Sequence, residues 1–279
     1  MIELGKMQTL EVKNITSVGV FLNTKDSQKK DKDVLLPKKE VPEGTKVGDE
    51  IEVFIYRDFK ERIIATTRRP KVILGEVGLL EVVDITSIGA FLDWGLEKDL
   101  FLPFKEQTTK LEKGRKYPIG LYIDKSNRLC GTMKIRDFLS SDSPYKENDW
   151  VKGVIYSIND KFGAFVAVDN KYEGLIPKKE LIGVYAIGDI VDVRVTNVKD
   201  DGKLDLSLRD KFYIEIEEDA EIILNKAMEK GGILYLNDYS SPKEIRKELN
   251  MSKSAFKRAL GRLLKEEKVE FIKGGIKVK

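Results

Sequence analysis

Apolar positions follow the two-residue period of β-strands over most of the chain. Ile51–Ile55 and Ile190–Val195 alternate apolar and polar side chains, as half-buried strands do. Three longer segments rich in Val, Ile and Phe contain Gly, which permits sharp strand bending; they are Glu11–Leu22, Glu81–Leu92 and Val151–Val168. After Arg209 the apolar spacing becomes helical. The pattern therefore predicts a β region followed by a different C-terminal domain.

The β region contains three copies of one unit. Each copy has a Gly inside an apolar run, found at Asn14–Leu22, Asp84–Leu92 and Ile158–Val166. Each then has an apolar pair followed by Pro and a charged end, found at Leu35–Glu40, Phe101–Glu106 and Leu175–Glu180. From that Pro it is 11 residues to a Gly in every copy, and from the Gly it is 14, 14 and 15 residues to a basic residue. Constant offsets of this kind predict a repeated fold.

Short strands in units of about 65 residues favour small closed barrels, because closure removes exposed sheet edges. We expect the units to span residues 1–69, 72–137 and 149–211. The first copy carries extra polar residues in Thr24–Asp33, which we interpret as a solvated loop. The linkers are Arg68–Lys71 and Leu139–Pro144, and the serines of the second predict a flexible joint near residue 140. Units one and two would then form one rigid group, and unit three with the C-terminal domain another.

The third copy resembles the S1 RNA-binding domain, which is an OB-type five-stranded barrel. The resemblance rests on Phe162–Val166, Glu173–Ile176, Gly188–Val195 and Lys203–Arg209. It covers residues 150–211 and extends to about 5–69 and 72–137 through the internal repeat. Members of that family bind single-stranded RNA with two aromatic residues, a His, an Asp and a basic residue. The resemblance therefore implies an RNA-binding face on each barrel.

In the third copy the aromatic positions of this face are Phe162 and Phe165, and the basic position is Lys203. The Asp position falls on Lys199 or Asp200, and every copy has Pro where the family has His. In the second copy the two aromatic positions hold Ile88 and Phe91, the Asp position holds Asp124 and the basic position holds Arg128. In the first copy the corresponding residues are Val18, Phe21, Asp58 and Arg62. Lys39, Lys105 and Lys179 follow the Pro by two residues, and the plain interpretation of each is a solvated surface lysine.

Bases stack on exposed rings for about 1–3 kcal/mol each, and Lys or Arg contacts to phosphate add affinity without reading sequence. Because only the third copy offers two rings, we expect the third barrel to bind RNA best. The alternative is that Phe162 or Phe165 packs inside the barrel. The same alternative is stronger for Phe21 and Phe91.

The apolar spacing in the C-terminal domain predicts a helix, a short strand at Ile233–Leu236, two more helices and a hairpin. Ser241, Pro242 and Glu244 have the order of a helix start, and Ser252 caps the next helix. The arrangement is similar to the winged-helix domain, expected over residues 217–279. By that resemblance the nucleic-acid contacts are Lys253, Ser254, Lys257, Arg258, Lys273 and Lys277. Winged helices also bind proteins, and the basic face is otherwise a solvated helix surface.

The distribution of charge along the sequence favours an anionic partner for the C-terminal domain. Residues 219–279 hold 14 Lys plus Arg and 9 Asp plus Glu, a net of +5, and the remaining residues hold 36 and 38, a net of −2. A cluster of acidic residues is compatible with a metal-dependent nuclease; it consists of Glu215, Glu217, Glu218, Asp219 and Glu221. The plainer interpretation is that the helix dipole favours acids near the start of a helix.

Several function classes are excluded or disfavoured. The chain has no His, which removes His-based catalysis and almost all zinc and haem sites. Its one cysteine, Cys130, forms no intrachain disulfide and is typical of a reducing compartment. No phosphate-binding loop and no apolar run long enough to span a bilayer is present. We therefore expect a cytoplasmic, non-enzymatic protein with no cofactor or metal.

Three S1-like units followed by one winged helix resemble the conserved virulence factor B family of bacterial RNA-binding proteins, over the whole chain. The resemblance implies a protein that influences gene expression, and thereby virulence, after transcription. The leading hypothesis is that single-stranded RNA binds the third barrel and the basic winged helix. The alternatives are a duplex-DNA-binding regulator led by the winged helix and a scaffold whose first two barrels bind protein.

Overall fold

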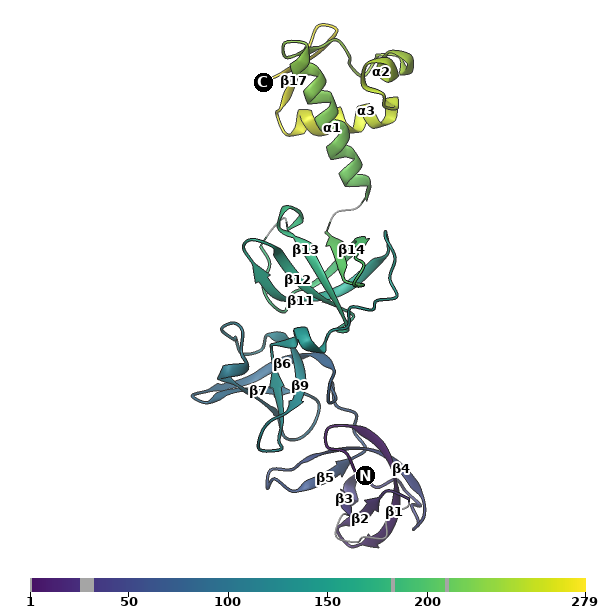
Figure 1. Cartoon of the computed structure of the whole chain (residues 1–279), viewed down its shortest axis with the longest axis vertical. Coiled ribbons are helices and arrows are strands. Elements are labelled where there is room, and N and C mark those ends of the chain that lie inside the picture. Colours follow the sequence, from purple (N-terminus) through teal and green to yellow (C-terminus); the bar gives the residue numbers. More distant parts are fainter. Residues whose placement is uncertain (1, 26–32, 182–183, 209–210) are drawn as a thin grey trace. The chain divides into compact units, whose positions relative to one another are not determined.

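The computed structural model describes residues 2–25, 33–181, 184–208 and 211–279, apart from the side chains of 211–215. The chain divides into two compact units, Met1–Leu208 and Arg209–Lys279. The first unit holds three small β-barrels in succession, and the second holds helices and a three-stranded sheet (Figure 1). The predicted fold class, mainly β barrels followed by a winged helix, is confirmed.

The first barrel consists of β1 (Met7–Thr16), β2 (Gly19–Asn23), β3 (Val34–Pro37), β4 (Glu50–Arg57) and β5 (Ile63–Thr66). It closes in the order β1-β2-β3-β5-β4, since β1 pairs antiparallel with β4 and β3 pairs parallel with β5. Alternate residues such as Leu10, Leu22 and Leu36 point inward and fill its core. The expected loop Thr24–Asp33 lies largely outside the described residues.

The other two barrels repeat this arrangement. The third consists of β11 (Trp150–Asn159), β12 (Gly163–Val168), β13 (Tyr172–Pro177), β14 (Ile190–Val198) and β15 (Leu204–Ser207), and closes in the same order. The second consists of β6 (Val77–Thr86), β7 (Gly89–Asp93), β8 (Leu100–Pro103), β9 (Lys116–Ile123) and β10 (Leu129–Thr132). Within its described residues no hydrogen-bonded ladder joins β8 to β10, so this copy is nearly rather than fully closed.

The Gly of the first repeated motif allows neighbouring strands to approach closely. Gly19, Gly89 and Gly163 have φ angles of +145°, +154° and +120°, which L side chains rarely adopt. A Cβ atom at these positions would stand 2.1, 2.4 and 2.1 Å from a carbonyl oxygen of the next strand. The pairing of β2, β7 and β12 with the following strand therefore requires glycine.

The Glu of the second repeated motif fastens a short 3₁₀ turn to the last strand of each barrel. These turns are η2 (Lys38–Glu40), η3 (Phe104–Glu106) and η5 (Lys178–Glu180). In each barrel a buried hydroxyl donates a hydrogen bond to the Glu carboxylate; the pairs are Thr66 with Glu40, Thr132 with Glu106 at 2.8 Å and Ser207 with Glu180 at 2.9 Å. Hydrogen bonds to charged groups contribute about 1.5–3 kcal/mol each, so this Glu has a structural role in all three copies.

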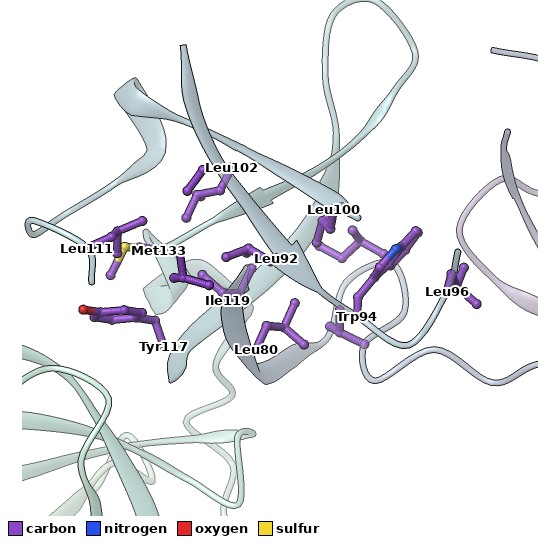
Figure 2. Packing of buried hydrophobic residues seen from close by; sticks show 14 of the residues in the cluster. Leu80, Leu92, Trp94, Leu96, Leu100, Leu102, Leu111, Tyr117, Ile119 and Met133 are labelled. Carbon is purple, nitrogen blue, oxygen red and sulfur yellow. The ribbon is translucent and has the colours of Figure 1, made fainter. Parts of the chain in front are cut away.

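The first and second barrels share an aromatic contact. Phe54 and Tyr56 of β4 meet the ring of Trp94, which follows β7, edge to face at centroid distances of 5.7 and 6.4 Å. All three rings belong to the same buried cluster as the core of the second barrel. Figure 2 shows that core, with Trp94 and Leu96 on the side near the purple ribbon of the first barrel. The two barrels are therefore held together by buried apolar surface.

The prediction of a flexible joint near residue 140 is wrong. Ile135, in η4 (Ile135–Phe138), and Val77 of the second barrel pack with Tyr156 and Ala167 of the third in one buried cluster. Arg115 also pairs with Asp189 across the two barrels, at 3.0 Å. Because this apolar contact fixes the joint, the third barrel belongs to the same compact unit as the first two, and the chain divides after Leu208 instead.

The second unit contains α1 (Lys211–Glu229), β16 (Ile233–Leu234), α2 (Pro242–Leu249), α3 (Lys253–Lys265), β17 (Val269–Ile272) and β18 (Gly275–Val278). The strands pair in the order β16-β18-β17. Ser241 and Glu244 form the predicted capping box at the start of α2, and Ser252 accepts a hydrogen bond from the backbone of Ala255 at the start of α3. Phe256, on the buried side of α3, lies in the core.

Candidate nucleic-acid interface

The third barrel presents its two predicted rings differently. Phe162, in the turn between β11 and β12, is 60% exposed. Phe165, on β12, is half-buried and lies against the ring of Tyr156 with centroids 6.1 Å apart. Phe162 is thus free to stack on a base, whereas Phe165 offers part of its ring and uses the rest in the cluster that joins the second and third barrels.

Basic side chains surround a hollow of about 190 Å³ beside Phe165. Lys203, the predicted basic residue, lies there with Lys199 and Arg136. The buried Glu173 pairs with Arg136 at 3.1 Å and approaches Lys203 at 3.9 Å. The hollow therefore combines one aromatic face with three cations held in place by carboxylates.

The turn that carries Lys203 decides which residue occupies the family's Asp position. Lys199 donates its backbone N–H to the carbonyl of Lys203 at 2.9 Å. Asp58 in the first copy and Asp124 in the second make the same bond to their basic residues. Lys199, not Asp200, therefore occupies this position. The third copy has a cation where the other copies have an acid.

Carboxylates also act on Lys203 itself. Its hydrogen bond to Asp201, at 2.7 Å, and the charges of Asp201 and Glu173 raise the pKa of Lys203. The ammonium group stays charged at neutral pH and can contact a phosphate. Lys179, on η5, is exposed, and its role in RNA binding stays a prediction.

In the first barrel the basic position is already paired. Arg62 donates two hydrogen bonds to the carboxylate of Asp58, at 2.9 and 2.7 Å. Burial raises the pKa of Asp58, but these bonds outweigh it and the pKa is lowered overall. Phe21 is half-buried and pairs across the sheet with Leu35. This face therefore offers one half-buried ring and one paired cation, whereas the third barrel adds the exposed ring of Phe162.

In the second barrel the predicted face borders on the first barrel. Phe91 is half-buried, and its ring centroid lies 5.5 Å from that of Phe101. Arg128 is exposed and points toward Glu61 of the first barrel, with Nε and Oε2 3.8 Å apart. Both Phe91 and Arg128 line a pocket of about 460 Å³ between the two barrels, which we call the junction pocket; its other walls include Arg57, Phe59, Glu61 and Lys98.

In the winged-helix unit, α3 turns one side into the core and the other toward solvent. Ser254, Lys257 and Arg258 lie on the exposed side, and Lys253 is half-buried. Lys273, in the β17–β18 turn, and Lys277, on β18, are exposed as well. The predicted contact set is therefore accessible on α3 and on the wing.

The first turn of α1 holds no acidic residue, so the helix dipole does not explain the acids of this segment; one of them and the cysteine have structural roles. Glu217 pairs with Arg262 of α3 at 2.7 Å, which fastens the two helices together. Among the described residues no group of His, Cys, Asp and Glu side chains could hold a metal ion. Cys130 is buried, and burial raises the pKa of its thiol to about 11, so it is unreactive at neutral pH.

Sequence reasoning missed several exposed or site-lining residues. Arg136 belongs to the second barrel and reaches the hollow of the third, which no spacing within one repeat can reveal. Tyr235 and Tyr239 of the winged-helix unit are strongly exposed. The polar neighbours Asp238 and Ser240 were a signal for Tyr239, whereas Tyr235 stands between two leucines and gave none. No described helix combines the length and apolar character that crossing a membrane requires.

Comparison with known families divides the chain in the same way. The S1 domain family matches residues 4–68 and 74–134. The S1 RNA binding domain matches residues 145–209, and the CvfB-like winged helix domain matches residues 221–278.

Several relatives match this chain over nearly its whole length and nearly their own. The chain is 34% identical over 275 residues to the uncharacterized protein YitL of Bacillus subtilis, covering 95% of this chain and 90% of that protein. It is 25% identical to conserved virulence factor B of Staphylococcus epidermidis, covering 98% and 94%. Among solved structures it is similar to a multidomain protein with nucleic acid binding domains from Streptococcus pneumoniae, with a TM-score of 0.49, 26% identity and coverage of 99% and 98%.

Proposed function

Because the chain belongs to the conserved virulence factor B family, we propose that it binds single-stranded RNA and influences gene expression after transcription. The third barrel provides the main contact, and the winged helix extends it. The protein acts in the cytoplasm by binding, without catalysing a reaction. The observation that carries the proposal is the exposed ring of Phe162 close in sequence to Phe165, whose hollow is lined by Lys199 and Lys203.

The chemistry of this face favours unpaired bases. A ring at the surface can stack on a base only when that base is not enclosed in a duplex, and stacking is tolerant of sequence because every base has a π-face. Lys199, Lys203 and Arg136 add phosphate contacts beside Phe165. The combination supports a single strand that runs along β12 with its bases on the rings.

The third barrel is favoured over the others because its turn carries two cations, Lys199 and Lys203, which pair with Asp205 and Asp201 at 3.1 and 2.7 Å. Arg62 of the first barrel is held by Asp58, and Arg128 of the second faces Glu61. In the third barrel Lys199 replaces the acid of the other copies. This replacement makes the face more basic without changing the turn.

The winged helix adds charge more than specificity. Lys257 on α3 and Lys273 on the wing are exposed, and each phosphate contact adds affinity that falls with salt. The same surface supports a second candidate, binding of duplex DNA through α3. In that case the winged helix would lead and the third barrel would contribute little.

Fluorescence anisotropy with labelled single-stranded RNA and duplex DNA of equal length, at two salt concentrations, separates these candidates. Tighter binding of RNA, partly retained at the higher salt, is expected if stacking contributes. A preference for the duplex, together with a larger loss of affinity from Lys257→Ala than from Phe162→Ala, would assign the function to the winged helix. Binding to neither would support a protein scaffold, with the partner recovered on residues 1–137.

A further inference from the structure

The junction pocket lies between the first two barrels, and the family resemblance of single barrels does not predict it. Its volume of about 460 Å³ lies within the range of about 300–1,000 Å³ that small-molecule sites occupy. Arg57, Phe59 and Glu61 come from the β4–β5 hairpin of the first barrel. Phe91, Lys98 and Arg128 come from the second. Neither barrel forms the pocket alone.

One wall of the pocket is aromatic. Phe91 and Phe101 lie with their rings 5.5 Å apart and tilted by 45°. Phe59 of the first barrel also lines the pocket and is 72% exposed, although a phenyl ring favours burial. An exposed ring beside two partly buried ones can receive a flat ring by stacking.

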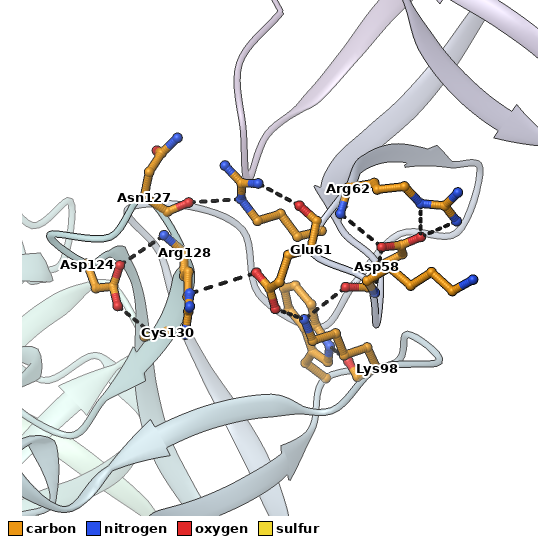
Figure 3. A network of polar contacts seen from close by, with 11 residues as sticks. Asp58, Glu61, Arg62, Lys98, Asp124, Asn127, Arg128 and Cys130 are labelled. Atoms are coloured by element: carbon orange, nitrogen blue, oxygen red, sulfur yellow. Dashed lines mark hydrogen bonds and ion pairs between the residues drawn. The ribbon is translucent and has the colours of Figure 1, made fainter.

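The polar side of the pocket holds three cations, Arg57, Lys98 and Arg128, and two carboxylates, Glu61 and Asp99. Glu61 accepts a hydrogen bond from Lys98 at 2.7 Å and lies 3.8 Å from Nε of Arg128 (Figure 3). Arg57 donates to the carbonyl oxygens of Glu61 and Asn127, at 2.7 and 3.0 Å. The Lys98 hydrogen bond and the neighbouring cations lower the pKa of Glu61. A negative charge is therefore favoured at the position of the Glu61 carboxylate, whereas burial and the charge of Asp93 raise the pKa of Asp99.

The backbone of Glu61 is unusual for its residue type. Its φ angle is +61°, and its N–H bonds to the carbonyl of Asp58 at 3.0 Å. The same turn position holds Asn127 in the second copy and Gly202 in the third, which are the residue types that tolerate this conformation. Strained residues cluster at ligand sites and switch segments, so Glu61 at this position points to a role for its carboxylate.

We propose that the junction pocket binds one nucleotide, with its base against Phe59 and Phe91 and its phosphate at Lys98 and Arg128. The phosphate takes the place that the Glu61 carboxylate holds in the unliganded protein. A flat ring joined to an anion is the chemistry of a nucleoside monophosphate. Free nucleotides and the nucleotides of an RNA strand share it, and the inference rests on the proposed function only for the second source.

The fluorescence of Trp94 provides the test. Trp94 lines the pocket, and the chain has two tryptophans. The Trp150→Phe variant of the full chain leaves Trp94 as the reporter, and Trp150 is exposed, so the change is tolerated. UMP, AMP and a 5′-phosphorylated tetranucleotide are titrated separately. Saturable change with the mononucleotides identifies a free nucleotide as a ligand, and change with the tetranucleotide alone identifies a strand.

Two further variants, made in the same background, test the geometry. Phe59→Ala is expected to weaken binding about fivefold or more, because it removes a stacking ring. Glu61→Asn keeps the turn but removes the carboxylate, and is expected to tighten binding about fivefold, because the anion that competes with the phosphate for Lys98 and Arg128 is lost. A purely structural Glu61 would give equal or weaker binding. Thermal unfolding of each variant confirms that it is folded.

No saturable change of Trp94 emission with any of the three probes, or equal or weaker binding in the Glu61→Asn variant, overturns the proposal. Its failure is distinct from failure of the proposed function. Trp94 reports on the junction pocket, while the anisotropy of a longer labelled RNA reports on the whole chain. Loss of the first signal with the second intact removes the nucleotide site alone.

Discussion

Replacing Phe162 and Phe165 separately by Ala tests which of the two rings stacks on RNA and which packs within the protein. Phe162 is 60% exposed, so about two fifths of its side chain is removed from water. Full burial of Phe contributes about 1.5–3 kcal/mol, and Phe162→Ala should therefore cost about 0.6–1.2 kcal/mol of unfolding free energy. Loss of one stacked base costs about 1–3 kcal/mol, which corresponds to a 5- to 150-fold drop in RNA affinity.

Phe165→Ala should give a different ratio of the two effects. Phe165 is half-buried in the cluster with Tyr156 and Ile135, so we expect a loss of about half the 3–5 kcal/mol typical of a buried Phe. Its RNA affinity should fall as well. Phe162→Ala thus weakens binding with little change of stability, whereas Phe165→Ala lowers both.

Anisotropy with single-stranded RNA measures the first quantity, and urea unfolding measures the second. Phe104→Ala is the matched control, because Phe104 is an exposed phenylalanine on the second barrel outside the predicted face. It should leave RNA affinity within about twofold of the parent protein. An equally small change for Phe162→Ala would refute the reasoning, because an exposed ring that bases do not contact cannot carry the site.

Other substitutions probe other parts of the molecule. Gly163→Ala should lower the unfolding free energy by several kcal/mol more than Gly48→Ala in urea titrations, because both have positive φ but only Gly163 faces a backbone oxygen. Lys257→Ala should reduce the slope of log affinity against log salt by about 0.7 for single-stranded RNA; an unchanged slope would remove Lys257 from the interface. Burial raises the pKa of Cys130 to about 11, so the stabilisation from its buried thiol is present below the unfolded pKa of about 8.5 and is lost as pH rises toward 11. Alkylation of Cys130 at pH 8 should accordingly be more than about 100-fold slower in the folded protein than in urea, and similar rates would contradict its burial.

The sequence predicts what is local or repeated. The repeat offsets predict the barrels, because each Gly and each Glu has the same contact in every copy, as Gly163 and Glu180 illustrate. The caps of α2 and α3 follow from Ser241 and Ser252, because a cap involves residues only three positions apart.

Contacts between repeats could not be predicted in this way. Arg136 reaches the hollow of the third barrel, and Phe59 completes a pocket with Phe91, only because separately folded surfaces meet. The serines near residue 140 predicted a flexible joint, but Tyr156 and Ile135 make it rigid because they bury apolar surface between the barrels. Such contacts depend on which outer faces are apolar, and outward positions of a strand carry no periodic signal that names their partner.

Phe165 belongs at once to a surface predicted to bind RNA and to the joint between two barrels. A substitution at Phe165 must satisfy both stacking on RNA and packing at the joint, whereas a substitution at Phe162 must satisfy stacking alone. Tyr or Trp at Phe162 would keep a ring in solvent and cost little, so this position can drift among aromatic residues as RNA preferences change. At Phe165 a larger ring must also fit against Tyr156. The joint therefore restricts the range of sequences that the predicted binding face can adopt.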